Sequence, residues 1–214
     1  MTPLSRRAFA VAAMASLLVG CGGHGADRTT TTARPRSTPP PSSASASGSA
    51  SASASAKGAH ALGRSVPVGL RIPAIGVDTP VMRLGLASDG SVQVPPVTAH
   101  DRAGWYRHSP TPGQVGPSVI LGHVTVGSYG DGVFRHLARL HRGDRIVARL
   151  ENGTAAVFTV TAVRTVAKAD FPADEVYGNV NRPELRLITC GGPRTGDGYL
   201  DNVIVFAALT SATS

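Results

Sequence analysis

Most of the chain after residue 65 consists of short apolar runs that Gly, Pro, Asn and Asp residues interrupt. This pattern limits the possible folds more than any other feature, because short apolar runs bounded by turn formers predict β-strands. Many short strands with few helices favour a closed or nearly closed barrel, so we expect an all-β fold. The eight predicted strands are Val68–Ile72, Val81–Leu84, Val92–Val94, Ser118–Leu121, Arg145–Leu150, Val157–Val166, Glu184–Thr189 and Asn202–Leu209.

One stretch has a helical period instead. Val133, Phe134, Leu137 and Leu140 recur at the spacing of one helix face, which predicts a helix over Val133–Leu140. We therefore expect an eight-stranded barrel with one or two short helices. The 149 residues from 66 to 214 are enough for one well-packed domain, since a chain of this size buries about two thirds of its surface.

Residues 1–21 have the pattern of an export signal. Arg6 and Arg7 precede the apolar run Ala8–Gly20, whose 13 residues are fewer than the roughly 20 that a membrane-spanning helix needs. Residues 5–9, Ser-Arg-Arg-Ala-Phe, resemble a twin-arginine export signal. An ordinary charged start of a general export signal is the alternative.

The end of this signal resembles a bacterial lipobox. Leu-Val-Gly at residues 18–20 stands directly before Cys21, which predicts cleavage before a lipidated Cys21. Two acyl chains suffice for stable anchoring, so we expect an exported protein on the outer face of the cytoplasmic membrane. A chance cysteine beside an ordinary cleavage site is the alternative.

Residues 22–65 predict a disordered tether. Residues 37–56 contain nine Ser, six Ala and three Pro, with no aromatic or branched aliphatic side chain to bury. Such a segment cannot offset the entropy lost on ordering. As a flexible coil it would span roughly 35 to 40 Å, enough to lift a domain from a membrane into a cell wall.

The net charge of +8 lies mostly outside the predicted domain. Seven basic residues and one acidic residue precede Val66, whereas 14 basic and 12 acidic residues follow from there. Nucleic-acid binding depends on a basic surface that neutralises phosphates, and the predicted domain shows none. We expect no nucleic-acid partner.

The chain has two cysteines, Cys21 and Cys190. If Cys21 is lipidated, Cys190 remains unpaired in an oxidising compartment. An unpaired thiol is a liability there, so this favours a functional role for Cys190. Cys190 follows the predicted strand and precedes Gly191-Gly192, so we expect a strand end that opens into a flexible loop, where reactive side chains meet substrates. A buried, inert cysteine is the alternative.

A nucleophilic cysteine needs a proton-transferring partner and a group that stabilises an oxyanion. The predicted domain contains five histidines, His100, His108, His123, His136 and His141. Only His123 directly follows a predicted strand, after Gly122, in the way that Cys190 follows another. A structural histidine is the alternative.

Three sequence features together resemble the sortase family: Leu-Gly-His at residues 121–123, Leu-Ile-Thr-Cys at 187–190, and the strand Asn-Val-Ile-Val-Phe-Ala at 202–207. Gly-Gly at 191–192, Tyr-Leu-Asp-Asn at 199–202 and Phe-Pro-Ala-Asp-Glu-Val-Tyr-Gly at 171–178 are similar to the actinobacterial class F branch. Sortases are eight-stranded β-barrel cysteine transpeptidases. The resemblance covers residues 66–210.

The resemblance implies a role for several side chains. Cys190 would attack the Thr carbonyl of a Leu-Pro-x-Thr-Gly-like sorting signal, and His123 would protonate the leaving amine. At pH 7 a free cysteine is mostly thiol and a histidine mostly neutral, so a thiolate and imidazolium pair implies a bell-shaped dependence of rate on pH. Arg194 would stabilise the oxyanion, Thr189 would contact the substrate, and Asn202 would support the site. A surface loop arginine at residue 194 and purely structural strand roles for the other two residues are the alternatives.

The implied partners are secreted proteins with a sorting signal and a peptidoglycan-precursor amine, with hydrolysis when no amine is present. The domain histidines lack metal-ligand spacing and no Asp and Glu cluster predicts a calcium site, so we expect no cofactor and no metal. A lipid-anchored cysteine peptidase and a non-catalytic surface binding module are the alternatives. Thiol reactivity and dependence on an acceptor amine would distinguish the three.

Overall fold

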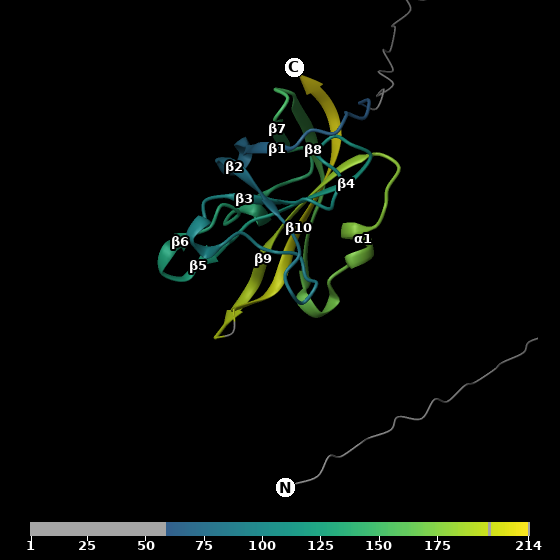
Figure 1. Cartoon of the computed structure of the whole chain (residues 1–214). Helices are drawn as coiled ribbons and strands as arrows, with labels where there is room; N and C mark the ends of the chain where they lie inside the picture. The colour runs from purple at the N-terminus through teal and green to yellow at the C-terminus, as the bar shows by residue number, and fades with distance from the viewer. Residues whose placement is uncertain (1–58, 197, 214) are drawn as a thin grey trace, which may run out of the picture. The chain divides into compact units, whose positions relative to one another are not determined.

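The protein forms a closed eight-stranded barrel (Figure 1). The computed structural model describes residues 59–196 and 198–213, so the predicted export signal, Cys21 and most of the predicted tether lie outside the described residues. In the order in which they pair around the barrel, the strands are β1 (Pro67–Ile72), β2 (Val77–Leu84), β3 (Ala103–Tyr106), β4 (Gly116–Leu121), β9 (Pro183–Thr195), β10 (Gly198–Thr213), β8 (Ala155–Ala167) and β7 (Arg145–Leu150).

Most neighbouring strands are antiparallel, but β2 with β3 and β4 with β9 are parallel. β5 (Thr125–Val126) and β6 (Gly130–Asp131) form a separate small sheet beside the barrel, and α1 (Ala173–Tyr177) lies near β4 (Figure 1). Short 3-10 turns complete the described part: η1 (Pro73–Ile75), η2 (Val97–Ala99), η3 (Gly127–Tyr129), η4 (Leu137–Arg139) and η5 (Lys168–Asp170). The prediction of an all-β, eight-stranded barrel is confirmed.

Alternation along β9 divides the core into two clusters. Leu185 and Leu187 belong to the larger cluster, which fills the barrel with fully buried rings such as Trp105 and Phe158. Ile188 belongs to a second cluster on the opposite face. Successive side chains of a strand point to opposite faces, so a nearly continuous apolar run in β9 lets it bury both sides.

The chain already packs against the barrel ahead of β1. The Leu62 backbone N–H donates to the Gly113 carbonyl at 2.8 Å, and the Leu62 side chain contacts the larger core cluster. The Ser65 N–H donates to the Thr111 hydroxyl at 3.2 Å. Residues 59–65 therefore form part of the packed domain. No helix of the described ranges has the length and apolar character of a membrane span.

One strand prediction is wrong, and one strand was missed. The run Val92–Val94 is not a strand: Val92 forms only an isolated bridge to Leu86, because Pro95 and Pro96 follow at once and cannot donate ladder hydrogen bonds. The strand in this region is β3, a short Ala-Gly-Trp-Tyr segment whose first two residues are poor strand formers. Pairing with β2 and β4 makes it a strand.

The predicted helix over Val133–Leu140 is wrong. The Leu137, Arg139 and Leu140 backbone N–H groups donate to carbonyls only three residues earlier, at 3.0, 2.9 and 3.2 Å, so the α-helical bonds to the fourth residue back do not form. Only the short turn η4 forms there. The apolar spacing reflects burial of Phe134 and Leu137 in the barrel rather than a helix face. The α-helix of the described residues is α1 instead.

A buried charge network joins β9 to α1. The Glu184 carboxylate accepts hydrogen bonds from Arg182 and Arg186, and Glu184 and Arg186 are only 7% and 3% exposed. Arg186 also donates to the Glu175 carbonyl at 3.3 Å, and its guanidinium lies 4.6 Å from the Phe206 ring centroid. Burial raises the pKa of Glu184, but the bonds from the two arginines outweigh it and hold that pKa below its ordinary value.

This network predicts a specific loss of stability in acid. A carboxylate with a lowered pKa stabilises the fold above the ordinary glutamate pKa near 4.3, and that contribution is lost as the pH falls through the folded-state pKa. We expect Glu184→Gln to lower the free energy of unfolding by about 2 kcal/mol at pH 7 and by much less at pH 3, measured by urea unfolding. Glu151→Gln, at an exposed carboxylate 4.0 Å from Arg83, serves as control and should change little. An equal loss at both pH values would contradict the prediction.

Candidate active site

The parallel pairing of β4 with β9 sets the position of His123 and Cys190. Leu121 pairs with Ile188 in the register, and the Gly122 N–H donates to the Ile188 carbonyl at 3.1 Å. His123 and Cys190 each follow two residues after this pair. Cys190 lies within β9, on the same face of the strand as Ile188, whereas His123 lies in the segment that directly follows the end of β4. The register therefore brings two adjacent chain segments, one with the thiol and one with the imidazole, to the same end of this strand pair.

Cys190 does not lie at a strand end, contrary to the expectation from the sequence. β9 continues to Thr195, and Cys190 pairs with Asn202 of β10 within the ladder. The thiol is free and half-buried. Gly192 has a positive φ of 71°, and a Cβ there would collide with the Asp201 carboxylate. This glycine therefore permits close approach of the two strands and does not mark a flexible loop.

His123 is held by a main-chain carbonyl. Its Nε2 lies 2.6 Å from the carbonyl oxygen of Pro95. A carbonyl can only accept, so Nε2 carries the hydrogen and Nδ1 is the ring nitrogen left for chemistry. The ring is half-buried. Pro95 itself is buried in the segment between β2 and β3.

The loop after His123 is closed by backbone hydrogen bonds. The Gly132 N–H donates to the Val124 carbonyl at 3.0 Å, and the Phe134 N–H donates to the His123 carbonyl at 2.8 Å. A Cβ on Gly132 would overlap the His123 carbonyl and its Cβ. Only glycine permits this approach, so Gly132 contributes to the placement of His123.

A cavity of about 330 Å³ lies beside Cys190. Its lining brings together the residues around the cysteine with parts of the loop after His123: Val124, Phe134, Arg135, Ala138, Thr165, Thr189, Cys190, Gly191, Gly192, Tyr199 and Val203. Thr189 is 4% exposed, and its Oγ1 has no hydrogen-bond partner among the described residues. Cys190 and Thr189 thus share this cavity, whereas His123, Arg194 and Asn202 are not part of its lining.

Arg194 lies near the end of β9, opposite Tyr199 of β10. The guanidinium carbon lies 5.9 Å from the Tyr199 ring centroid, and the arginine is exposed. Asn202 is paired with Cys190 through the backbone, as noted above. The structure therefore places both residues on the strand pair that carries the cysteine, with Tyr199 between Arg194 and the cavity.

Tyr199 and Arg135 line this cavity but were not among the site residues predicted from the sequence. Tyr199 belongs to the Tyr-Leu-Asp-Asn stretch that contributed to the family resemblance, so a signal for it was present. Arg135, which pairs with Asp131, falls within the wrongly predicted helix and had no such signal.

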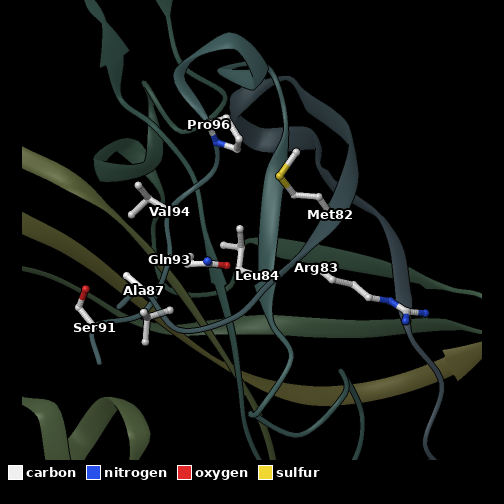
Figure 2. A pocket seen from close by; sticks show the side chains of 9 residues that line it. Met82, Arg83, Leu84, Ala87, Ser91, Gln93, Val94 and Pro96 are labelled. Carbon is white, nitrogen blue, oxygen red and sulfur yellow. The ribbon is translucent and has the colours of Figure 1, made fainter. Parts of the chain in front are cut away.

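Two further cavities lie along the segment between β2 and β3. One, of about 530 Å³, is bordered by Met82 and Leu84 of β2 and by Val94 and Pro96 on the facing segment (Figure 2). The other, of about 650 Å³, includes aromatic side chains from β3 and from the region around α1, namely Tyr106, Phe171 and Tyr177. Val94 and Pro96 flank Pro95, so the first cavity lies next to the residue that holds His123.

Metal-ligating side chains do not gather in the described ranges: no group of three or more His, Cys, Asp or Glu residues there is arranged to hold a metal ion.

The chain belongs to the sortase family, because the sortase-domain family model matches residues 70–210. The SrtA sortase from Actinomyces oris is 28% identical, with 71% of this chain and 84% of that chain covered and a TM-score of 0.52. Sortase A from Listeria monocytogenes shares the fold at 19% identity, covering 69% and 89% of the two chains with a TM-score of 0.51. No curated protein matches. The protein is accordingly a sortase-type cysteine transpeptidase.

The close approach at Gly132 predicts that Gly132→Ala displaces His123. The added methyl group must push the His123 backbone aside, and a displacement of about 1 Å costs up to 100-fold in rate. We expect the rate of peptide cleavage to fall at least tenfold, measured with a quenched peptide. Gly63→Ala, whose Cβ would meet no atom within 4 Å, is the matched control. Full activity in Gly132→Ala would show that His123 does not depend on this contact.

The bond to Pro95 predicts one tautomer for His123. At pH 9, well above the reference pKa of histidine near 6.5, two-bond ¹H–¹⁵N spectra should show Nε2 protonated, with a slowly exchanging hydrogen. The exposed His141 provides the internal control and should show no such slow hydrogen. Protonation of His123 at Nδ1 instead would mean that the Pro95 carbonyl does not hold the ring.

Proposed function

We propose that this sortase cleaves a Leu-Pro-x-Thr-Gly-like signal between Thr and Gly and transfers the protein to a cell-wall amine. The observation that carries the proposal is the β4–β9 register, in which His123 and Cys190 each follow two residues after the Leu121 and Ile188 pair. That geometry supports a thiol and an imidazole acting on one bound peptide bond.

In the acylation step the Cys190 thiolate attacks the Thr carbonyl carbon, and a tetrahedral oxyanion forms. Collapse of this intermediate breaks the C–N bond, and His123 gives its Nδ1 proton to the departing Gly nitrogen. The products are a thioester on Cys190 and a free Gly amine. The Pro95 carbonyl accepts from the Nε2–H group before and after the transfer, so Nδ1 is the nitrogen that gives and takes the proton.

In the second step an amine attacks the thioester carbonyl. His123 takes a proton from the attacking nitrogen at Nδ1, an amide forms, and the Cys190 thiolate leaves. Water reacts in the same way when no amine arrives, so hydrolysis is the side reaction. A peptidoglycan-precursor amine is the proposed acceptor.

Arg194 is the proposed oxyanion-stabilising group. A permanently charged guanidinium with several donors suits that task, and Arg194 lies on the strand that carries Cys190. The buried, unpartnered Thr189 hydroxyl in the Cys190 cavity is free to accept or donate a bond to substrate. Asn202, paired with Cys190, supports the strand geometry at the nucleophile.

The cavities along the segment that connects β2 to β3 have apolar linings that suit the Leu and Pro side chains of the signal. Met82, Leu84 and Val94 offer aliphatic surface, and Tyr106 and Phe171 offer aromatic surface. Burial of such side chains contributes about 25 cal/mol per Å².

The cellular setting belongs to the same proposal. Export of the chain, lipidation at Cys21 and a tether from residue 22 up to the packed residues 59–65 would hold the domain at the outer face of the membrane, within reach of the wall. The Gly-Gly, Tyr-Leu-Asp-Asn and Phe-Pro-Ala-Asp-Glu-Val-Tyr-Gly stretches support a class F assignment.

A quenched Leu-Pro-x-Thr-Gly peptide library tests the function directly. We expect cleavage between Thr and Gly, which mass spectrometry would detect. The product should be an amide when an amine is added and a carboxylic acid when none is present. Cys190→Ala should abolish cleavage, and His123→Ala should lower kcat by at least 100-fold. The rate should depend on pH as a bell-shaped curve.

The control variant for this test is His141→Ala, at an exposed histidine away from the β4–β9 pair. It should cleave at the rate of the unaltered protein. Cleavage that persists in Cys190→Ala would reject the proposed mechanism. A cut that never yields an amide with any amine would reject transfer and leave a peptidase.

A further inference from the structure

Tyr199 links three parts of the candidate active site. Its hydroxyl lies 2.6 Å from the hydroxyl of Thr125, two residues after His123. Its ring lies beneath the Arg194 guanidinium, 5.9 Å from the guanidinium carbon. The same side chain lines the cavity beside Cys190.

The Tyr199–Thr125 hydrogen bond joins segments 74 residues apart in sequence. Within residues 59–196 and 198–213, the loop from residue 123 to residue 132 makes no other side-chain hydrogen bond to β9 or β10. The backbone bond from Gly122 to Ile188 holds the base of this loop, and the Tyr199 hydroxyl holds it further out.

A displacement of Thr125 would also displace His123, because backbone hydrogen bonds hold the loop that contains both residues together. The bonds from Gly132 to Val124 and from Phe134 to His123 fix the loop backbone on both sides of Thr125. Thr125 itself lies in β5, which pairs with β6. Loss of the Tyr199 hydroxyl would therefore free the loop that carries the histidine, while β9 and β10 stay paired.

We propose that Tyr199 is a positioning residue of this active site: its hydroxyl holds the loop of His123, and its ring supports Arg194. This inference rests on the proposed roles of His123 and Arg194. One side chain thus fixes, relative to Cys190, both the proton donor and the group that meets the oxyanion. Small misplacements of such groups are costly, because the reaction requires aligned partners.

The first test is a double-mutant cycle in the full chain. Tyr199→Phe and Thr125→Val each remove one hydroxyl of the bond and keep most of the side-chain shape. We expect each to lower kcat for peptide cleavage about tenfold with KM within about twofold, and the double variant to lose no more than either. Multiplied losses in the double variant, or unchanged kcat in both single variants, would overturn the proposal.

The second test concerns the ring. Tyr199→Leu should lose about a further tenfold in kcat relative to Tyr199→Phe, because the Leu side chain offers no aromatic face to Arg194. In an Arg194→Ala background this extra loss should vanish. Persistence of the extra loss in that background would overturn the support of Arg194 by the ring.

Amide hydrogen exchange provides a readout that does not depend on activity. We expect Tyr199→Phe and Thr125→Val to speed exchange of the Gly132 and Phe134 amides at least fivefold, with exchange in β9 and β10 unchanged. Tyr129→Phe is the matched control, since the Tyr129 hydroxyl is exposed in the same loop and makes no hydrogen bond with the described residues.

The two readouts separate the possible failures. Unchanged exchange and unchanged kcat in a protein that cleaves and transfers peptide would overturn the role of Tyr199 and leave the proposed function standing. Faster exchange in a protein that cleaves no peptide would reject the proposed function and, with it, the positioning role, leaving only a structural contact.

Discussion

The candidate active site depends on the parallel pairing of β4 with β9. This ladder places Leu121 directly beside Ile188, although the two residues lie 67 positions apart in the sequence. His123 and Cys190 each follow this pair by two residues, His123 just beyond the end of β4 and Cys190 within β9. The register therefore sets which part of β9 lies beside the chain segment that carries His123.

Backbone groups also contribute to the position of His123. The Pro95 carbonyl determines which nitrogen of His123 carries a hydrogen, and the missing Cβ of Gly132 makes room for the histidine's own carbonyl. The Tyr199 hydroxyl joins the same loop to β10. The proposed nucleophile and the proposed proton donor are thus held by contacts with the surrounding chain, as expected where catalysis depends on alignment.

The apolar runs and turn formers of the sequence predicted the barrel. At two places, however, tertiary contacts gave a secondary structure that differs from the one the local sequence predicted. Residues 133–140 have a helical apolar spacing, yet this spacing reflects burial of Phe134 and Leu137 against the barrel strands. β3 is only four residues long and begins with Ala103 and Gly104, and it is a strand because β2 and β4 flank it. Both cases share one cause: the strands that each segment packs against or pairs with include ones far away in the sequence, where no local window can detect them.

The sequence by itself determined the fold class and singled out Cys190 and His123 as candidate reactive side chains, because alternation, turn formers and the placement of both residues after apolar runs are local features. It did not determine that β9 runs past Cys190 to Thr195, nor that Pro95 and Tyr199 hold the histidine and its loop. Those contacts were decided by the tertiary structure, since a main-chain carbonyl has no sequence signature and a hydrogen bond across 74 residues exists only once the barrel has closed.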